Sequence, residues 1–232
     1  MNGYLNYEKV IGKIDDYLQK YDFISVTSLC SSASGRRIPI ITYGEGQTVI
    51  VYVAGEGTDD TTSVSVLLRF FRDICELYKN HGAAYGFSAE NIFNKYTIVV
   101  LPLINPDKES YPENEIGELR NFLKFGAAPN MVLSFSSSSD EEGRILFGEG
   151  ERDAKMAIAL AQMSGLRRCF SETKEPRLSL KDWAKNELSC SSFSVELPRV
   201  QGFSKKNLED KLFASYAEIR KILFCAPYLN KI

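Results

Sequence analysis

Two long apolar segments most constrain how this chain can fold. TVIVYVA (48–54) and YTIVVLPL (96–103) are almost continuously apolar. Such runs are typical of central strands that are covered on both faces by helices. Between them, apolar residues recur at helical spacing from Val64 to Tyr78, which predicts an amphipathic helix. We therefore expect a strand, a helix and a second strand that belong to one sheet.

The rest of the chain continues this alternation. Further strands are predicted at residues 23–29, 36–43, 130–136, 144–147 and 191–197, and further helices at residues 7–21, 151–163 and 205–224. The pattern predicts an α/β fold, a three-layer α/β/α sandwich around a mixed, mostly parallel sheet. The chain has 232 residues, no internal repeat and no linker-like change in composition, so we expect residues 1–232 to form a single domain.

The composition argues against several classes of partner. The net charge is −2 and 25% of the residues are charged, so nothing favours a nucleic acid or a membrane surface. No apolar run is long enough to span a bilayer, and residues 1–20 resemble an amphipathic helix rather than a secretion signal. Five scattered cysteines without Cys-x-x-Cys spacing argue against a zinc knuckle or a disulfide framework and predict a reducing cytoplasm. The oligomeric state stays open.

Six short segments, in this order, resemble segments of the zinc carboxypeptidases, the carboxypeptidase A-like metallopeptidases. They are SSASGRRIPIITYG, VAGEGTDDTTS, VVLPLINPDK, ELRNF, VLSFSSSSDEEGRILF, and KDWA followed by SFSVELP. In the third and fourth, Lys108 and Leu119 replace a glycine and an asparagine of the family's pattern. The resemblance implies a carboxypeptidase-like fold and, for the family, hydrolysis of peptides with a zinc cofactor.

The resemblance also shows where the family's zinc ligands, two histidines and a glutamate, fall in this chain. They fall on Gly57, Asp60 and Ser136. Counting back from Gly143 would place the last ligand on Asp140 instead, but insertions are tolerated better in loops than in buried strands, which favours Ser136. Neither alignment provides an imidazole, and the chain's one histidine, His81, cannot replace two ligands. We therefore expect no zinc cofactor.

The missing metal has a large energetic consequence. Catalytic zinc lowers the pKa of its bound water from about 15.7 to about 7. At about 1.36 kcal/mol per pKa unit, this makes deprotonation easier by on the order of 12 kcal/mol. Serine and carboxylate side chains do not replace such an effect, so zinc-dependent peptide hydrolysis is not expected.

Three other residues match functional positions of the family. Glu196 matches the glutamate that acts as general base, and Arg120 matches the arginine that binds the substrate carboxylate or polarises its carbonyl; Asn121 follows it. Glu196 and Arg120 also have plain structural alternatives. Glu196 would then be a strand-end carboxylate paired with an arginine or lysine, and Arg120 would form a surface ion pair.

Two polar segments could have another function, as a cation site or as a serine nucleophile. Glu56, Asp59, Asp60 and Asp140 offer oxygen ligands for Ca²⁺ or Mg²⁺. We favour the simpler interpretation that Asp59 and Asp60 cap the following helix. The serine run SFSSSSDEEG lacks a neighbouring base in any recognised nucleophile motif, so it predicts a polar loop.

The leading hypothesis is a carboxypeptidase-like pseudoenzyme that has lost its zinc site and binds a peptide or a protein partner in the residual cleft. One alternative is an active metallocarboxypeptidase-type peptidase that acts on small peptides or cell-wall fragments with substitute metal ligands. Another is a structural or oligomerisation module.

Overall fold

A computed structural model of the chain describes residues 5–138, 142–171, 179–198, 200 and 205–229. The helices are α1 (Tyr7–Lys20), α2 (Thr61–Lys79), α3 (Ala89–Lys95), α4 (Glu113–Asn121), α5 (Glu151–Ser164), α6 (Leu180–Leu188) and α7 (Lys205–Leu229), and a π-helical turn, Phe122–Ala127, continues α4. The strands are β1 (Ile24–Ser31), β2 (Arg37–Tyr43), β3 (Thr48–Val53), β4 (Ala83–Ala84), β5 (Phe87–Ser88), β6 (Tyr96–Leu101), β7 (Met131–Ser138), β8 (Arg144–Phe147), β9 (Arg167–Phe170) and β10 (Ser191–Pro198).

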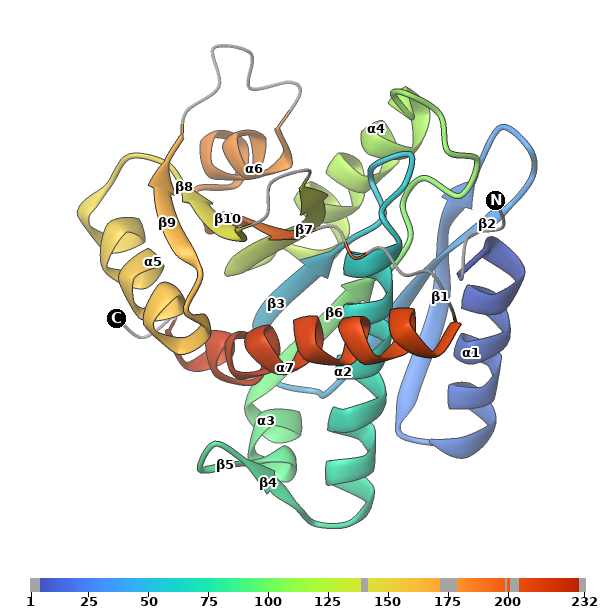
Figure 1. Cartoon of the computed structure of the whole chain (residues 1–232), viewed down its shortest axis with the longest axis horizontal. Coiled ribbons are helices and arrows are strands. Elements are labelled where there is room, and N and C mark those ends of the chain that lie inside the picture. Colours follow the sequence, from blue (N-terminus) through green and yellow to red (C-terminus); the bar gives the residue numbers. More distant parts are fainter. Residues whose placement is uncertain (1–4, 139–141, 172–178, 199, 201–204, 230–232) are drawn as a thin grey trace.

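One mixed sheet forms the middle layer of the fold. Its strands lie in the order β1-β2-β6-β3-β7-β10-β8-β9, while β4 and β5 form a separate small hairpin. The neighbours β6/β3, β3/β7, β7/β10 and β8/β9 run parallel, and the other three pairs run antiparallel. The predicted mixed, mostly parallel sheet is confirmed (Figure 1).

Helices cover both faces of the sheet, which gives the predicted three-layer sandwich. Buried residues of α1, α2, α3, α5 and α7 pack on one face, and buried residues of α4 and α6 pack on the other. The apolar segments that led to this prediction, now β3 and β6, are the centre of the sheet, and Ile50 and Ile98 in them are fully buried. None of the described helices is long and apolar enough to cross a bilayer.

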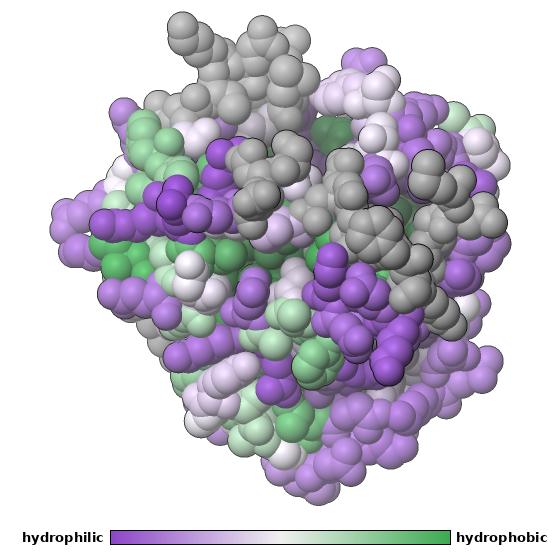
Figure 2. Space-filling model, in the orientation of Figure 1, coloured by the Kyte–Doolittle hydropathy of each residue, from purple (hydrophilic) through white to green (hydrophobic). Residues whose placement is uncertain are grey.

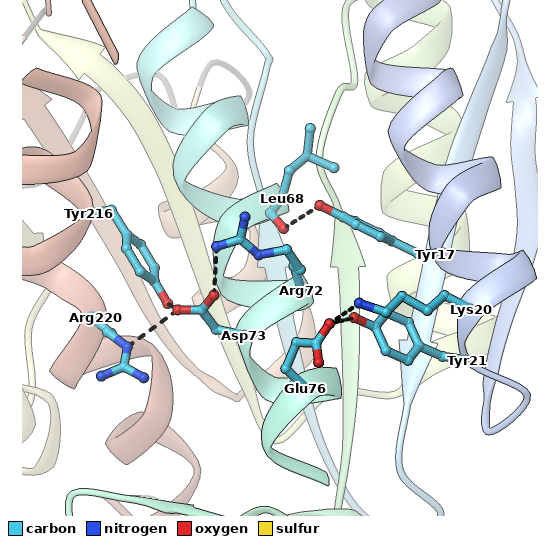
Figure 3. A network of polar contacts seen from close by, with 9 residues as sticks. All are labelled: Tyr17, Lys20, Tyr21, Leu68, Arg72, Asp73, Glu76, Tyr216 and Arg220. Atoms are coloured by element: carbon cyan, nitrogen blue, oxygen red, sulfur yellow. Dashed lines mark hydrogen bonds and ion pairs between the residues drawn. The ribbon is translucent and has the colours of Figure 1, made fainter. Parts of the chain in front are cut away.

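Polar contacts fix α1 and α7 on either side of α2 (Figure 3). From α1, the Tyr17 hydroxyl donates to the Leu68 carbonyl over 3.0 Å. From α7, the Tyr216 hydroxyl donates to Asp73 over 2.8 Å. On the face shown in Figure 2, hydrophilic side chains surround smaller apolar areas, as expected where amphipathic helices turn their polar sides to solvent.

Two of the motif segments meet at one edge of the fold. Asp107 accepts hydrogen bonds from the Ser34 backbone N–H at 2.9 Å and from the Arg36 guanidinium at 3.2 Å. The turn between β1 and β2 is thereby attached to the loop after β6. The next residue, Lys108, has a φ of 59°, in the left-handed region that favours glycine.

Candidate functional site

The polar residues singled out in the sequence gather at the carboxyl ends of the parallel strands. Glu56 follows β3, Ser136 lies near the end of β7, and Glu196 lies near the end of β10. Glu196 is directly in register with Ser136 on one side and with Arg144 on the other. Residues in register on adjacent strands point to the same face, so these side chains form one polar area on the side covered by α4 and α6.

Next to this area, Asp60 connects the loop after β3 with the end of β7. One carboxylate oxygen accepts hydrogen bonds from the backbone N–H and the hydroxyl of Ser137, each at 2.7 Å, and the other accepts from the Gly55 N–H at 3.1 Å. Asp60 occupies the N-cap position of α2, but its side chain makes no capping hydrogen bond. The prediction that its carboxylate caps the helix is therefore wrong: the β7 end and the Gly55 backbone are its partners instead.

The residues at the family's ligand positions do not fit a zinc ion. Gly57 has no side chain, Ser136 offers only a hydroxyl, and both oxygens of Asp60 already accept hydrogen bonds from the protein. Protein zinc sites need three or four thiolate, imidazole or carboxylate ligands. Among the described residues, no group of three such side chains is arranged to hold a metal. Asp140, the alternative position, lies outside the described residues.

Glu56 is the acid at the centre of this polar area. Its carboxylate accepts a hydrogen bond from the Ser134 hydroxyl at 2.8 Å. Burial raises the pKa of Glu56 to about 7, and the negative charge of Asp60 adds to this effect, while the hydrogen bond from Ser134 and the charge of Arg120 oppose it. Glu56 can therefore exchange a proton near neutral pH, although the protein places no imidazole beside it.

Glu196 forms an ion pair of the kind that the structural alternative predicts. Its carboxylate forms an ion pair with Arg144 on the neighbouring strand β8, and 19% of its side chain is exposed. A general base must be able to reach the proton that it removes. In this arrangement a guanidinium group occupies one carboxylate oxygen of Glu196.

Arg120 lies in the last turn of α4 and lines a cleft between α4 and α6. The cleft has a volume of about 640 Å³. Its lining residues are Tyr111, Glu113, Ile116, Gly117, Arg120, Trp183, Asn186 and Glu187. The Arg120 guanidinium carbon is 5.4 Å from the centre of the Trp183 ring. Asn121 is exposed and is not among the lining residues.

The structure thus divides the predicted site into two parts. Ser136 and Glu196 lie together at the strand ends, and Asp60 is hydrogen-bonded to Ser137, the residue after Ser136. Arg120 lines the cleft between α4 and α6. Sequence reasoning missed the central place of Glu56, which it considered only as a cation ligand. One available signal was its position three residues after the end of β3, because ligands in such sheets bind at the carboxyl ends of strands.

Comparisons with known proteins agree with this geometry. The sequence model of the zinc carboxypeptidase family matches residues 13–118. The γ-D-glutamyl-L-diamino acid endopeptidase 1 of Lysinibacillus sphaericus is 26% identical over 109 residues, which are 46% of this chain and 28% of that protein. The uncharacterized protein YqgT of Bacillus subtilis is 31% identical over 102 residues, which are 43% of this chain and 26% of that protein. The matches thus span only about a quarter of these relatives' length.

The fold is similar to that of solved metallocarboxypeptidases. The metallo-carboxypeptidase of Burkholderia cenocepacia superimposes with a TM-score of 0.74 at 13% identity, over 93% of this chain and 68% of that chain. The thrombin-activatable fibrinolysis inhibitor gives a TM-score of 0.75 at 13% identity, over 98% of this chain and 77% of that chain. Residues 13–118 thus resemble the zinc carboxypeptidase family in sequence, and the chain has the fold of the solved metallocarboxypeptidases.

Proposed function

We propose that this chain is a carboxypeptidase-like pseudoenzyme, and that it binds a carboxylate-bearing peptide or protein segment in the cleft between α4 and α6. The observation that carries the proposal is which residues stand at the zinc-ligand positions and how they are bonded. Gly57 and Ser136 lack ligand groups, and Asp60 is hydrogen-bonded at both oxygens. The ion pair between Glu196 and Arg144 supports the same conclusion for the general base.

The cleft between α4 and α6 is suited to a ligand of modest size. Its volume of about 640 Å³ lies within the range of about 300 to 1,000 Å³ that is typical of ligand pockets. Arg120 offers a guanidinium group that can bind a carboxylate with two hydrogen bonds, and Trp183 offers an aromatic face. The name of the Lysinibacillus relative suggests γ-D-glutamyl peptides that carry a diamino acid as the first ligands to try. The cysteine pattern leads us to propose a cytoplasmic location.

Filling the cleft tests the binding part of the proposal. A Cβ added at Gly117 would meet no atom within 4 Å, so Gly117→Phe should fold and project a ring into the cleft. We expect this variant to lose peptide binding in isothermal titration calorimetry. Gly12→Phe is a matched control, because Gly12 is also helical, a Cβ there also meets no atom within 4 Å, and it does not line the cleft. Equal binding by both variants would contradict the assignment of this cleft.

Metal content and hydrolysis test the pseudoenzyme part. Protein purified without chelator should contain less than stoichiometric zinc and should release no C-terminal residues from a peptide library. The alternative of an active peptidase predicts release that Glu196→Gln abolishes.

Restoring the ligand set gives a positive control. A Cβ at Gly57 would meet only the Asp60 Cβ, at 3.8 Å, which is an ordinary contact. We expect the triple variant Gly57→His, Asp60→Glu, Ser136→His to take up about one zinc per chain, since two imidazoles and a carboxylate are a known catalytic ligand set.

A further inference from the structure

A second polar region lies away from the strand ends, where α2 passes between α1 and α7 (Figure 3). Ser65, Arg69 and Arg72 are spaced four and three residues apart on α2 and therefore share one side of that helix. The guanidinium carbon of Arg69 is 4.3 Å from the ring centre of Phe213 and 5.4 Å from that of Tyr216, both on α7. Arg69 thus packs against α7, and we call the place that Ser65, Arg69 and Arg72 share with Lys13 of α1 the crevice.

Positive charge is concentrated in this crevice. Lys13 lies one turn before Tyr17 on α1, which places it next to the same stretch of α2. Burial lowers the pKa of Lys13, and the nearby charges of Arg72 and Arg69 lower it further, whereas Glu209 of α7 raises it. Three cationic side chains are therefore near enough to repel one another.

The acidic groups nearby are too few to balance these charges. Asp73 accepts hydrogen bonds from Arg72 at 3.0 Å and from the Tyr216 hydroxyl at 2.8 Å, and it also lies 3.5 Å from Arg220. One carboxylate is thus shared by two guanidinium groups and a phenol. Glu209 is the other acid that acts on Lys13. Asp16 of α1 also acts on the neighbouring Tyr17. Among the described residues, these three carboxylates therefore face four cationic side chains, those of Lys13, Arg69, Arg72 and Arg220, so positive charge is in excess.

Two donors in the same place lack an acceptor. The Ser65 hydroxyl oxygen and the Arg69 Nε atom are buried, and no hydrogen-bond partner lies within reach of either among the described residues. Most buried polar groups in folded proteins are hydrogen-bonded, and leaving one unsatisfied is costly. Donors without acceptors beside several cations favour a ligand that is anionic and has several acceptor oxygens.

We propose that the crevice formed by Lys13, Ser65, Arg69 and Arg72 binds a phosphate group. A phosphate group combines up to two negative charges with three or more acceptor oxygens, and a guanidinium group binds it in the same two-bonded geometry that it uses for carboxylates. The phosphate group belongs either to a free ion or small phosphoester or to a phospholipid headgroup. The proposal goes beyond the peptide cleft and does not depend on it, since Arg120 and the cleft lie on the other face of the sheet.

The experiment measures binding of inorganic phosphate by calorimetry at constant ionic strength. We expect a Kd of about 1 mM or tighter for the unmodified chain. Lys13→Met removes one cation, and Arg69→Lys keeps the charge but loses the planar fork, so each should weaken binding about tenfold, or about 1.4 kcal/mol. Lys221→Met is the matched control because Lys221 is exposed on α7 and has no part in the crevice; it should bind as the unmodified chain does.

A second arm separates the two sources of the phosphate group. Sedimentation with phosphatidylcholine vesicles, with and without phosphatidic acid, is compared for the same four proteins. Phosphatidic-acid-dependent sedimentation that Lys13→Met and Arg69→Lys reduce supports the headgroup, and calorimetric binding without sedimentation supports the small ion. The proposal is overturned if neither probe binds, or if Lys221→Met reduces binding as much as Lys13→Met does.

Discussion

Replacing Asp60 with asparagine tests whether this carboxylate is a structural connection between the loop after β3 and the end of β7. The carboxylate accepts three hydrogen bonds: two from Ser137 at 2.7 Å and one from the Gly55 N–H at 3.1 Å. An asparagine amide keeps one acceptor oxygen and places an NH₂ group where the other oxygen was. Whichever way the amide turns, at least one buried donor then faces another donor.

The size of the loss follows from two opposing contributions. A buried donor without its acceptor costs about 1 to 3 kcal/mol. Burial is the largest influence on Asp60 and raises its pKa, so the folded protein holds this charge at a cost that asparagine does not incur. We therefore expect Asp60→Asn to lower the free energy of unfolding by about 2 kcal/mol rather than by the full sum of three bonds.

Urea denaturation at neutral pH, followed by circular dichroism, measures this difference. Asp59→Asn is the matched control, since Asp59 is the exposed neighbour and undergoes the same change of charge. We expect the control to lie within about 0.5 kcal/mol of the unmodified chain. If Asp60→Asn is as stable as Asp59→Asn, the carboxylate does not hold these segments together and is available to a ligand.

Three further substitutions test other parts of the structure. Burial alone would raise the pKa of Asp107, but hydrogen bonds from the hairpin and from Arg36 lower it. Asp107→Asn should therefore lower the free energy of unfolding by about 2 kcal/mol at neutral pH. The difference from the unmodified chain should disappear as the pH falls below about 4, which unfolding experiments across this range measure. Lys108→Gly should raise the free energy of unfolding by about 0.5 kcal/mol, because Lys108 has a φ of 59°, and Lys108→Ala should not. Tyr216→Phe removes the 2.8 Å hydrogen bond to Asp73 and should lower the thermal midpoint through a loss of about 1 kcal/mol; an unchanged midpoint would refute that contact.

The elements that the sequence predicted well are those with long apolar patterns. β3 and β6 could be predicted because both of their faces are buried, and α2 because its apolar stripe runs over five turns. α4 and α6 were missed as helices, since each has nine residues and only a few apolar positions that contact the sheet. β9, with the sequence RRCF, was also missed, because it is a short edge strand and its two arginines interrupt the apolar pattern that predicts a strand.

The site shows where prediction from one sequence stops. The alternation in SSFSVEL correctly placed Glu196 on the polar face of its strand. Its partner Arg144 could not be predicted, because that pairing depends on β8 lying next to β10 in the sheet. The bond between Asp60 and Ser137 likewise joins residues 77 positions apart, and only the parallel pairing of β3 with β7 brings them together. Side-chain partners across a sheet follow from strand order, which local patterns do not encode.

The same bond joins two segments of the site without the help of a metal ligand. Asp60 lies in the loop after β3 and Ser137 lies at the end of β7, and the Asp60 carboxylate accepts hydrogen bonds from three donors in these two segments. The ligand positions lie at the strand ends rather than in the apolar core, so replacing histidines there removes no core packing. A carboxylate with three hydrogen-bond donors can thus hold the strand ends in place without imidazole side chains at Gly57 and Ser136.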